Sequence, residues 1–251
     1  MKLITPTKRN AVYTAALLSV VGFYTSKLPA SDILAGEKYL KLHGGVGWYS
    51  EGKDKTLSYG NGNFDRFSAS SRDENGFQYG VSAGIKLPVE DGALGIGIGF
   101  YGQSEHDYKG YIDQYGKGSL RDFNYKFSIM SYRLMLEGSF EIPIQEQFKG
   151  FVTGGVGAAW NKFSSYEYSR ISPSERSPKP DFKNETKTAF AWQLGGGVEY
   201  EFTPELSASV YYLYVNNGKA ESKAENAPFS QKYETDDLTA HNLMFSLNYR
   251  F

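Results

Sequence analysis

The sequence predicts an all-β fold, an eight-stranded antiparallel up-and-down transmembrane β-barrel with short periplasmic turns and long extracellular loops. Three observations predict it. Segments of about ten residues alternate large apolar with small or polar residues, which is the period of a strand whose two faces meet different surroundings. The connections between these segments are alternately short and long. The 20 Tyr, 17 Phe and 28 Gly favour strands over helices.

Residues 1–30 have the features of a secretory signal peptide. Basic residues precede an apolar run over 11–24, and small residues follow it. The run is shorter than the roughly 20 residues that a spanning helix needs, which favours a cleaved signal peptide over a membrane-anchoring helix. We expect cleavage after Ala30, with Ala35 as the second choice, so that 31–251 form the barrel domain.

Four predicted strands lie in the first part of the barrel domain. The first (40–48) sets Leu, Val and Trp against Lys, His and Gly, and the second (77–87) sets aromatic and aliphatic residues against Gln, Ser, Gly and Lys. The third (94–101) alternates Leu, Ile and Phe with glycine. The fourth (130–140) sets Met, Tyr, Leu and Phe mainly against Ser, Arg and Glu.

Four further strands are predicted in the second part. The fifth (148–160) sets Phe, Val and Trp against Lys, Thr and Gly, and the sixth (190–202) sets large apolar residues against Gln, Gly and Glu. The seventh (206–214) places Leu, Ala, Val and Tyr at alternate positions, and the eighth (242–251) reads NLMFSLNYRF. An even number of strands is what bacterial single-chain barrels have.

The connections predict the topology of the barrel. Short turns rich in Pro, Gly and acidic residues read PVEDG, IPIQEQ and TPE. The other connections, near 49–76, 102–126, 161–188 and 215–239, are polar and run to about twenty residues or more. Connections of this length usually carry function or are disordered. We expect the short turns on the periplasmic side and the long loops on the extracellular side.

The face opposite the large apolar residues is predicted to line the lumen. It consists of Gly, Ser, Thr and Gln with isolated charges. On a water-facing surface so many glycines would weaken the strands, whereas in a narrow barrel they make room. Buried charges need partners. We therefore predict a lumen charge network that consists of Lys86, Arg133, Glu137, Glu199 and Arg250.

The apolar face is predicted to contact lipid. Its aromatic residues gather at both strand ends around a middle band of Leu, Ile, Val and Ala, as the interfaces of a bilayer select. The alternative is a lipocalin-like barrel with this face inward. It gives no reason for all Trp residues to lie at the same level along the barrel axis. The predicted aromatic girdle comprises Trp48, Phe77, Trp160, Phe190, Trp192, Tyr212 and Tyr214 at the long-loop rim and Phe140, Phe148, Tyr200, Phe202, Tyr249 and Phe251 at the other rim.

Aromatic residues also occur in the predicted long loops, where two interpretations are equally supported. They are either binding anchors or residues that pack the loops against each other. They are Tyr59, Phe64, Phe67, Tyr108, Tyr111, Tyr115, Tyr166, Tyr168, Phe229 and Tyr233.

No motif predicts an enzyme, a cofactor or a metal site. The SEHD stretch over 104–107 is expected to be a hydrated loop, because adjacent residues of an extended chain point to opposite faces. The glycines of GIGIGFYG lie within a strand and open no helix, so they predict lumen packing rather than a dinucleotide site. A formal net charge of -1 gives no electrostatic basis for binding nucleic acid.

The last third of the chain resembles known families. The terminal SLNYRF is similar to the C-terminal signature of outer-membrane β-barrel proteins, which implies that Tyr249 and Phe251 form an assembly signal for the barrel assembly machinery. The segment WQLGGGVEYEFTPELSASVYYLY resembles the sixth and seventh strands of the opacity-protein (porin-opacity) family and related alphaproteobacterial surface antigens.

This resemblance implies a surface protein of the bacterial outer membrane. We expect the barrel, embedded in outer-membrane lipid, to be a scaffold whose extracellular loops mediate adhesion or contact a host or environmental ligand. A narrow pore is the first alternative, although eight strands leave an interior only wide enough for side chains. A lipid A acyl-modifying enzyme is the second alternative.

Overall fold

The computed structural model describes residues 36–50, 53–60, 63–72, 75–171, 182–224 and 232–251. The predicted signal peptide and both of its cleavage sites lie outside these residues. So do the side chains of Tyr59 and Phe229.

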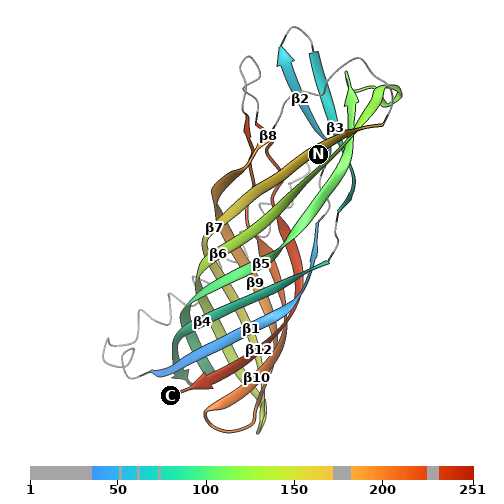
Figure 1. Ribbon diagram of the computed structural model, residues 1–251. Coiled ribbons are helices and arrows are strands. Elements are labelled where there is room, and N and C mark those ends of the chain that lie inside the picture. Colours follow the sequence, from blue (N-terminus) through green and yellow to red (C-terminus); the bar gives the residue numbers. More distant parts are fainter. Residues whose placement is uncertain (1–35, 51–52, 61–62, 73–74, 172–181, 225–231) are drawn as a thin grey trace, which may run out of the picture.

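Eight antiparallel strands close into a barrel (Figure 1). Each strand pairs with the next one in the ring, and β12 pairs with β1 to close it. The strands are β1 (Glu37–Tyr49), β4 (Asn75–Val89), β5 (Gly92–Gln114), β6 (Arg121–Gln145), β7 (Phe148–Arg170), β9 (Glu185–Glu201), β10 (Leu206–Asn216) and β12 (Thr239–Arg250). The predicted fold class is confirmed.

Short elements complete the extracellular end. They are β2 (Lys55–Gly60), β3 (Asn63–Arg72), β8 (Phe182–Lys183), β11 (Lys223–Ala224) and the 3-10 helix η1 (Gly118–Leu120). The β2–β3 hairpin joins the barrel sheet because β5 changes its partner: residues 92–103 of β5 pair with β4, and residues 108–114 pair with β3. Among the described residues, no helix has the length and apolar character to cross a bilayer.

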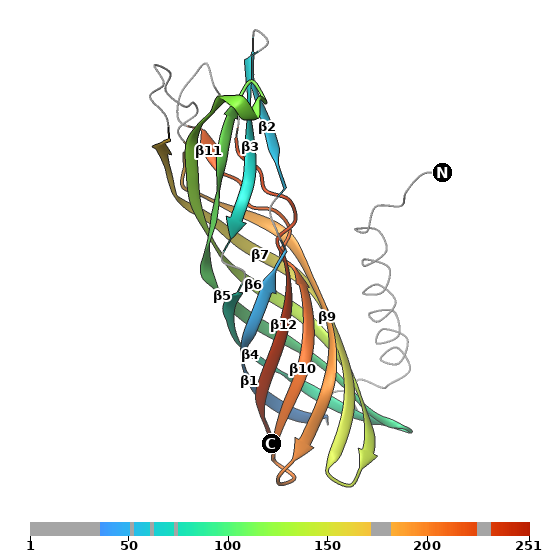
Figure 2. The same cartoon turned by 90° about the vertical axis from the view of Figure 1, so that its right-hand side faces the viewer.

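The prediction of long polar loops over 102–126 and 161–188 is wrong for much of these segments. Most of the first is strand, and the second is strand as far as Arg170, because β5, β6 and β7 continue beyond the barrel (Figure 2). The register of β5 shifts between Gln103 and His106, and β7 contains Ser165 with a φ of 56° next to a second shift. An extra residue of this kind reverses which alternate positions face inward, so the pattern of period two is interrupted although the strand continues.

Inward and outward residues alternate regularly along the whole of β6, and the polarity of each face changes where the strand passes from lipid to water. Its outward residues run from Leu136, Leu134, Tyr132 and Met130 to Ser128, Lys126 and Asn124. Its inward residues run from Glu137, Met135, Arg133 and Ser131 to Ile129, Phe127, Tyr125 and Phe123. The polarity of the two faces therefore inverts near Met130, as expected where a strand leaves lipid for water.

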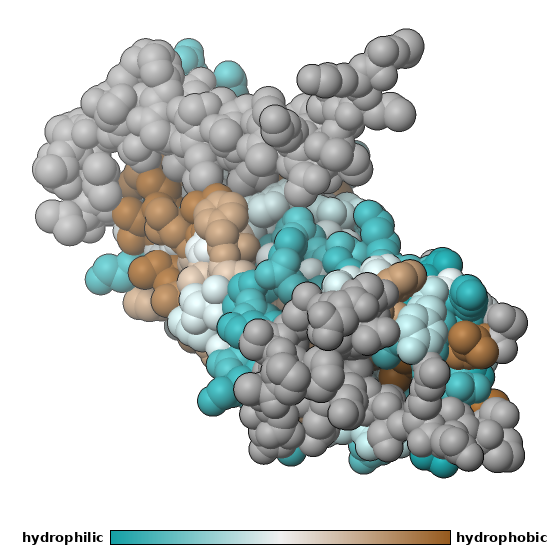
Figure 3. Space-filling model, turned by 90° about the horizontal axis from the view of Figure 1, so that it is seen from above, coloured by the Kyte–Doolittle hydropathy of each residue, from teal (hydrophilic) through white to brown (hydrophobic). Residues whose placement is uncertain are grey.

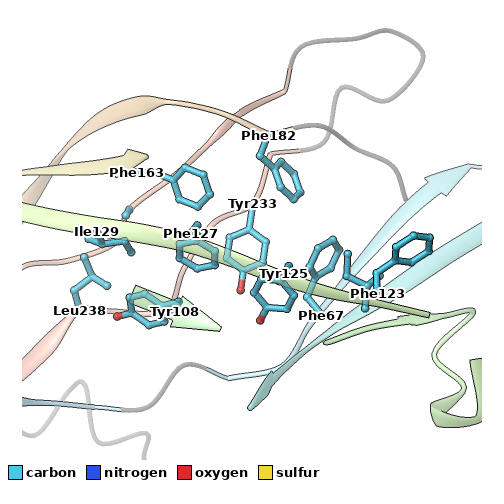
Figure 4. Close-up of a cluster of buried hydrophobic side chains, with 12 residues drawn as sticks. Phe67, Tyr108, Phe123, Tyr125, Phe127, Ile129, Phe163, Phe182, Tyr233 and Leu238 are labelled. Atoms are coloured by element: carbon cyan, nitrogen blue, oxygen red, sulfur yellow. The ribbon is translucent and has the colours of Figure 1, made fainter. Parts of the chain in front are cut away.

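The inward apolar residues above this level form a hydrophobic core outside the membrane, which we call the extracellular core (Figure 4). β6 contributes four of its twelve residues, more than any other element, and β3, β5, β7, β8 and the β10–β12 connection supply the rest. It consists of Phe67, Tyr108, Ile112, Phe123, Tyr125, Phe127, Ile129, Phe163, Phe182, Ala220, Tyr233 and Leu238. The rings of Phe127 and Phe163 stack at 4.7 Å between centroids.

The surface follows the same division. Seen from above, hydrophobic residues gather at the left, over the lower barrel wall, and hydrophilic residues prevail toward the extracellular end at the right (Figure 3). Exposed aliphatic residues of the wall include Leu42, Ile98, Leu136, Val198 and Leu247. This band is the lipid-contacting surface of an outer-membrane barrel.

Candidate functional site

The lower lumen is filled by buried ion pairs. The Lys86 ammonium lies 2.7 Å from a Glu141 carboxylate oxygen and 3.6 Å from one of Glu199. Lys41 lies 3.9 Å from Glu141 on the other side. Two lysines and two glutamates thus balance each other's charge, as buried ions require.

Glu199 is fully buried and has hydrogen-bond donors besides the lysine. Ser207 donates to one carboxylate oxygen at 2.8 Å, and Asn248 donates to the other at 2.9 Å. Ser209 contributes a longer bond of 3.3 Å. The adjacent strands β10 and β12 therefore replace the water that this carboxylate loses on burial.

Glu137 and Arg133 lie one layer higher and are linked through neutral groups rather than by a direct ion pair. Glu137 accepts hydrogen bonds of 2.6 Å from both the Tyr101 hydroxyl and the Gln193 amide. Arg133 donates to the same Gln193 at 3.2 Å and to Gln78 at 3.1 Å. The guanidinium also lies over the Tyr101 ring, 4.6 Å from its centroid.

Arg250 closes the periplasmic end. It donates to Glu201, which also holds Lys149 at 2.7 Å, and it lies 4.0 Å from Glu37. The five predicted lumen charges therefore fall into three successive groups rather than one network.

Lys41, Glu141, Lys149 and Glu201 were missing from the predicted network. All four occupy lumen-facing positions of the alternation, so the sequence contained the signal that could have found them. They lie near strand ends, where a side chain could equally have extended into the periplasm.

The middle of the lumen leaves little free space. His43 contacts the Ser82 hydroxyl at 2.9 Å and the Tyr211 hydroxyl at 2.8 Å. The neighbouring cavity has a volume of ≈ 30 Å³ and is lined by residues that include Lys41, Tyr101 and Glu137. A polar cavity of this size holds only a few water molecules at most.

The predicted girdle residues lie mostly on the outer surface. Trp48, Phe77, Trp160, Phe190 and Tyr212 are exposed around the upper wall, and Phe148, Phe202, Tyr249 and Phe251 are exposed around the lower wall. Tyr214, Phe140 and Tyr200 are partly covered. Trp192 differs from the prediction because it is only 7% exposed, with its ring 5.2 Å from that of Tyr214. The role of these rings at the bilayer interfaces stays a prediction.

The residues of the SEHD stretch do not form a hydrated loop, because they belong to β5. Their side chains have separate partners: the Ser104 hydroxyl accepts from the Phe77 amide, Asp107 binds Lys126, and Glu105 accepts from Ser164. His106 is buried and stacks on Tyr49 at 4.4 Å. The His106 ring lies 3.5 Å from the backbone carbonyl of Ser104, while the Ser104 hydroxyl binds the Phe77 amide.

The aromatic residues of the predicted loops divide between the two interpretations. Phe67, Tyr108 and Tyr233 belong to the extracellular core, and Tyr166 packs against it. Phe64 and Tyr168 are exposed, and Tyr111 and Tyr115 are partly exposed. Packing therefore accounts for one group and leaves the other at the surface.

Several exposed apolar residues lie at the end of the molecule farthest from the periplasmic turns. The Tyr115 amide donates to the Phe64 carbonyl, and the Ile171 amide donates to the Asp122 carbonyl, two residues after Leu120. These bonds join β3, the β5–β6 connection and the end of β7. We call Phe64, Leu120, Tyr168 and Ile171, whose exposed fractions run from 37% to 48%, the distal tip.

A second extracellular feature is a cluster of ion pairs over the barrel mouth. Lys187 lies 2.7 Å from Glu221 and 2.8 Å from Glu234. Lys219 also binds Glu234 at 2.7 Å, and Lys232 binds Glu221. Hydrogen bonds from Lys187 and then Lys219 lower the pKa of Glu234 to about 2. This lysine–glutamate cluster fixes the β10–β12 connection to β9.

Comparisons with known proteins agree with this architecture. The family model described as "Outer membrane protein beta-barrel domain" matches residues 15–251. The outer membrane protein PagN of Salmonella typhimurium is 26% identical over 184 residues, covering 65% of this chain and 73% of PagN. Among solved structures, OprG of Pseudomonas aeruginosa is 15% identical, with 85% of this chain and 97% of OprG covered and a TM-score of 0.46. Ail, the attachment invasion locus protein of Yersinia pestis, is 14% identical, with 86% and 99% covered and a TM-score of 0.41.

The closed ring of strands, the apolar outer band and the filled polar lumen define an outer-membrane β-barrel of the opacity type. The chain belongs to the outer membrane protein β-barrel domain family, and its place is the bacterial outer membrane.

Proposed function

We propose that this protein is an adhesion-type surface protein whose barrel anchors a ligand-binding extracellular sheet. The distal tip carries this proposal. Its apolar side chains lie beyond the polarity inversion of β6, so they face water rather than lipid. Several exposed apolar residues at one end of a molecule in water typically mark an interaction surface.

The extracellular core supports the same function. It holds β3, β5, β6 and β7 in one sheet, and a rigid platform lowers the entropy lost when a ligand binds. Arginines accompany the apolar residues of the tip: Arg170 lies over the Phe123 ring at 5.8 Å, and Arg121 lies over Tyr111 at 4.4 Å. Aromatic residues with arginine are typical of binding hot spots.

Cell attachment tests the proposal. The protein and a variant with Phe64→Ser, Leu120→Ser and Ile171→Ser are produced in a non-adherent bacterium, and attachment to epithelial layers, matrix proteins and an abiotic surface is counted. We expect the protein to confer attachment to at least one of them and the variant to lose it by roughly tenfold or more.

The control variant carries Thr56→Ala and Lys162→Ala, two exposed extracellular positions away from the tip. It should attach like the unchanged protein. Heat-modifiable mobility on electrophoresis confirms that each barrel is folded. Absence of attachment to all three surfaces, or unchanged attachment of the tip variant, would contradict the proposed function.

A further inference from the structure

A second extracellular surface has the chemistry of a saccharide site. It lies on the outward face of the sheet formed by β3, β5, β6 and β7, below the distal tip. A groove of ≈ 370 Å³ runs across it. This volume is in the range of small-molecule sites. The groove is lined by Ser70, Lys109, Gly110, Tyr111, Asn124, Tyr125, Lys126, Glu167, Tyr168 and Ser169.

Strand register arranges its polar side chains in two rows. In the first row Lys109 lies opposite Lys126, and Lys126 lies opposite Glu167. In the second row Tyr111 lies opposite Asn124, which in turn lies opposite Ser169. Because neighbouring strands are about 4.8 Å apart, each row spans roughly 10 Å across three strands, which matches one or two sugar rings.

The lysine pair gives the groove its charge preference. Like charges at directly opposite positions of neighbouring strands destabilise a sheet. Lys126 pairs with Asp107 at 2.8 Å, and the same carboxylate also attracts Lys109, although no carboxylate of the described residues is within ion-pair distance of Lys109. An anionic group placed between the two ammonium groups would relieve this repulsion. Glu167 at the far end disfavours a second anionic group and can accept bonds from hydroxyls.

The position of the groove indicates where such a saccharide comes from. β6 keeps the same alternation of inward and outward residues from the lipid-contacting Leu134 and Tyr132 to Lys126, although its pairing with β7 shifts register between Ser128 and Lys126. Lys126 is six residues beyond Tyr132, which is roughly 20 Å along the strand and about 15 Å above the aromatic level at the usual tilt. The groove therefore faces sideways into the layer of sugars carried by neighbouring glycolipids.

We infer that this groove binds a saccharide with a single anionic group, phosphate or carboxylate, that belongs to the glycolipid of the surrounding outer leaflet. Lys109 and Lys126 hold the anionic group, Asn124, Ser169 and Glu167 bond to hydroxyls, and Tyr111 offers ring surface. The groove borders the distal tip at Tyr168 but includes none of Phe64, Leu120 and Ile171, so the protein would use one surface toward its own membrane and another toward its ligand.

The test compares lipopolysaccharides of different length. Folded full-length protein in phospholipid nanodiscs is titrated with lipopolysaccharide that has a phosphorylated core oligosaccharide and with the same lipid truncated to lipid A. We expect the complete form to bind at least tenfold more tightly. The Lys109→Gln and Lys126→Gln double variant should bind both forms equally, at the weaker level.

Lys162→Gln is the matched control, because Lys162 lies on the same outward face close to Trp160. It should retain the preference for the complete form. The tip variant should retain it as well, because none of its three changed residues lines the groove. Equal binding of the two lipids by the unchanged protein, or an undiminished preference in the double variant, would overturn the inference. The free core oligosaccharide should compete more strongly for the groove than an unrelated soluble acidic oligosaccharide does. If both compete equally, the assignment of the ligand to the glycolipid would be overturned.

Discussion

Small residues on the lumen face determine how closely aromatic rings can approach the wall. The Tyr39 phenol lies against both Gly84 and Gly97, and a Cβ at Gly84 would be 2.6 Å from its oxygen. An alanine at either position would therefore collide with a buried ring. The other glycines of GIGIG are crowded in the same way, because a Cβ at Gly95 would meet Ser139 and a Cβ at Gly99 would meet Tyr101. The sequence pattern predicts lumen packing for these glycines.

Replacing Gly97 by Ala should lower the free energy of unfolding by about 1–3 kcal/mol, because the new methyl group overpacks a filled interior. Urea-induced unfolding in lipid vesicles, followed by Trp fluorescence, measures the change. Gly44→Ala is the control, since a Cβ there meets only Phe77 at 3.7 Å. If both variants unfold at the urea concentration of the unchanged protein, contact with Tyr39 does not limit this position.

At the scale of elements, the eight membrane strands could be predicted because outward residues must be apolar to contact lipid and inward residues are polar or small. Every strand therefore alternates between the two kinds of residue. The same rule failed where β6 leaves the membrane. Phe123, Tyr125 and Phe127 are apolar and alternate, but they point inward, so a search for outward apolar residues did not extend the strand to them. The extracellular parts of β5 and β7 were not predicted either, because bulges interrupt their alternation and have no reliable sequence signal.

Truncation of Phe127 tests whether the extracellular core is an element with its own stability. Phe127→Ala removes a ring that contacts Tyr108, Phe163 and Tyr233 and should destabilise the extracellular sheet by about 3–5 kcal/mol. Hydrogen exchange should rise in 104–129 and stay slow in the membrane part of β6. The exposed Phe64→Ala is the control. A uniform change along β6 would show that the two parts unfold together.

The lysine–glutamate cluster makes the β10–β12 connection sensitive to acid. The folded-state pKa of Glu234 is lowered to about 2, below its ordinary value of 4.5. Its contribution is therefore complete above about pH 4.5 and is lost as the pH falls toward 2. Pepsin should cleave this connection readily at pH 2 and poorly at pH 4. Glu234→Gln should be cleaved similarly at both values, after correction for the activity of pepsin on an unfolded peptide.

On the scale of the whole molecule, polar and charged side chains line the described lumen and bind one another. Charges of opposite sign pair from Arg250 at the periplasmic end to Lys86 and Glu141, and the carboxamides of Gln193 and Gln78 bind Arg133 in the upper lumen. The sequence predicted charges on the lumen face, because isolated ions there need partners. It did not predict the pairing, because side-chain rotamers decide which of several carboxylates each lysine reaches.

The filled lumen predicts that the narrow-pore alternative fails. Refolded protein in a planar bilayer should show no stable conductance at neutral pH, since an eight-stranded barrel has an interior that side chains fill. A Lys86→Ala and Glu141→Ala variant, which empties one layer, is the comparison and should also stay closed at the Arg133 layer. Stable current through the unchanged protein that alters with Glu137→Gln would restore the pore as a function.

The unbroken course of β6 has a mechanical consequence. Its hydrogen-bonded ladders with β5 and β7 extend from the periplasmic turn to the level of the tip. Tension applied to the outer end of the protein would pull along these strands and load many backbone bonds in shear at once. A cell held by such an attachment could resist fluid flow without peeling the protein open one bond at a time.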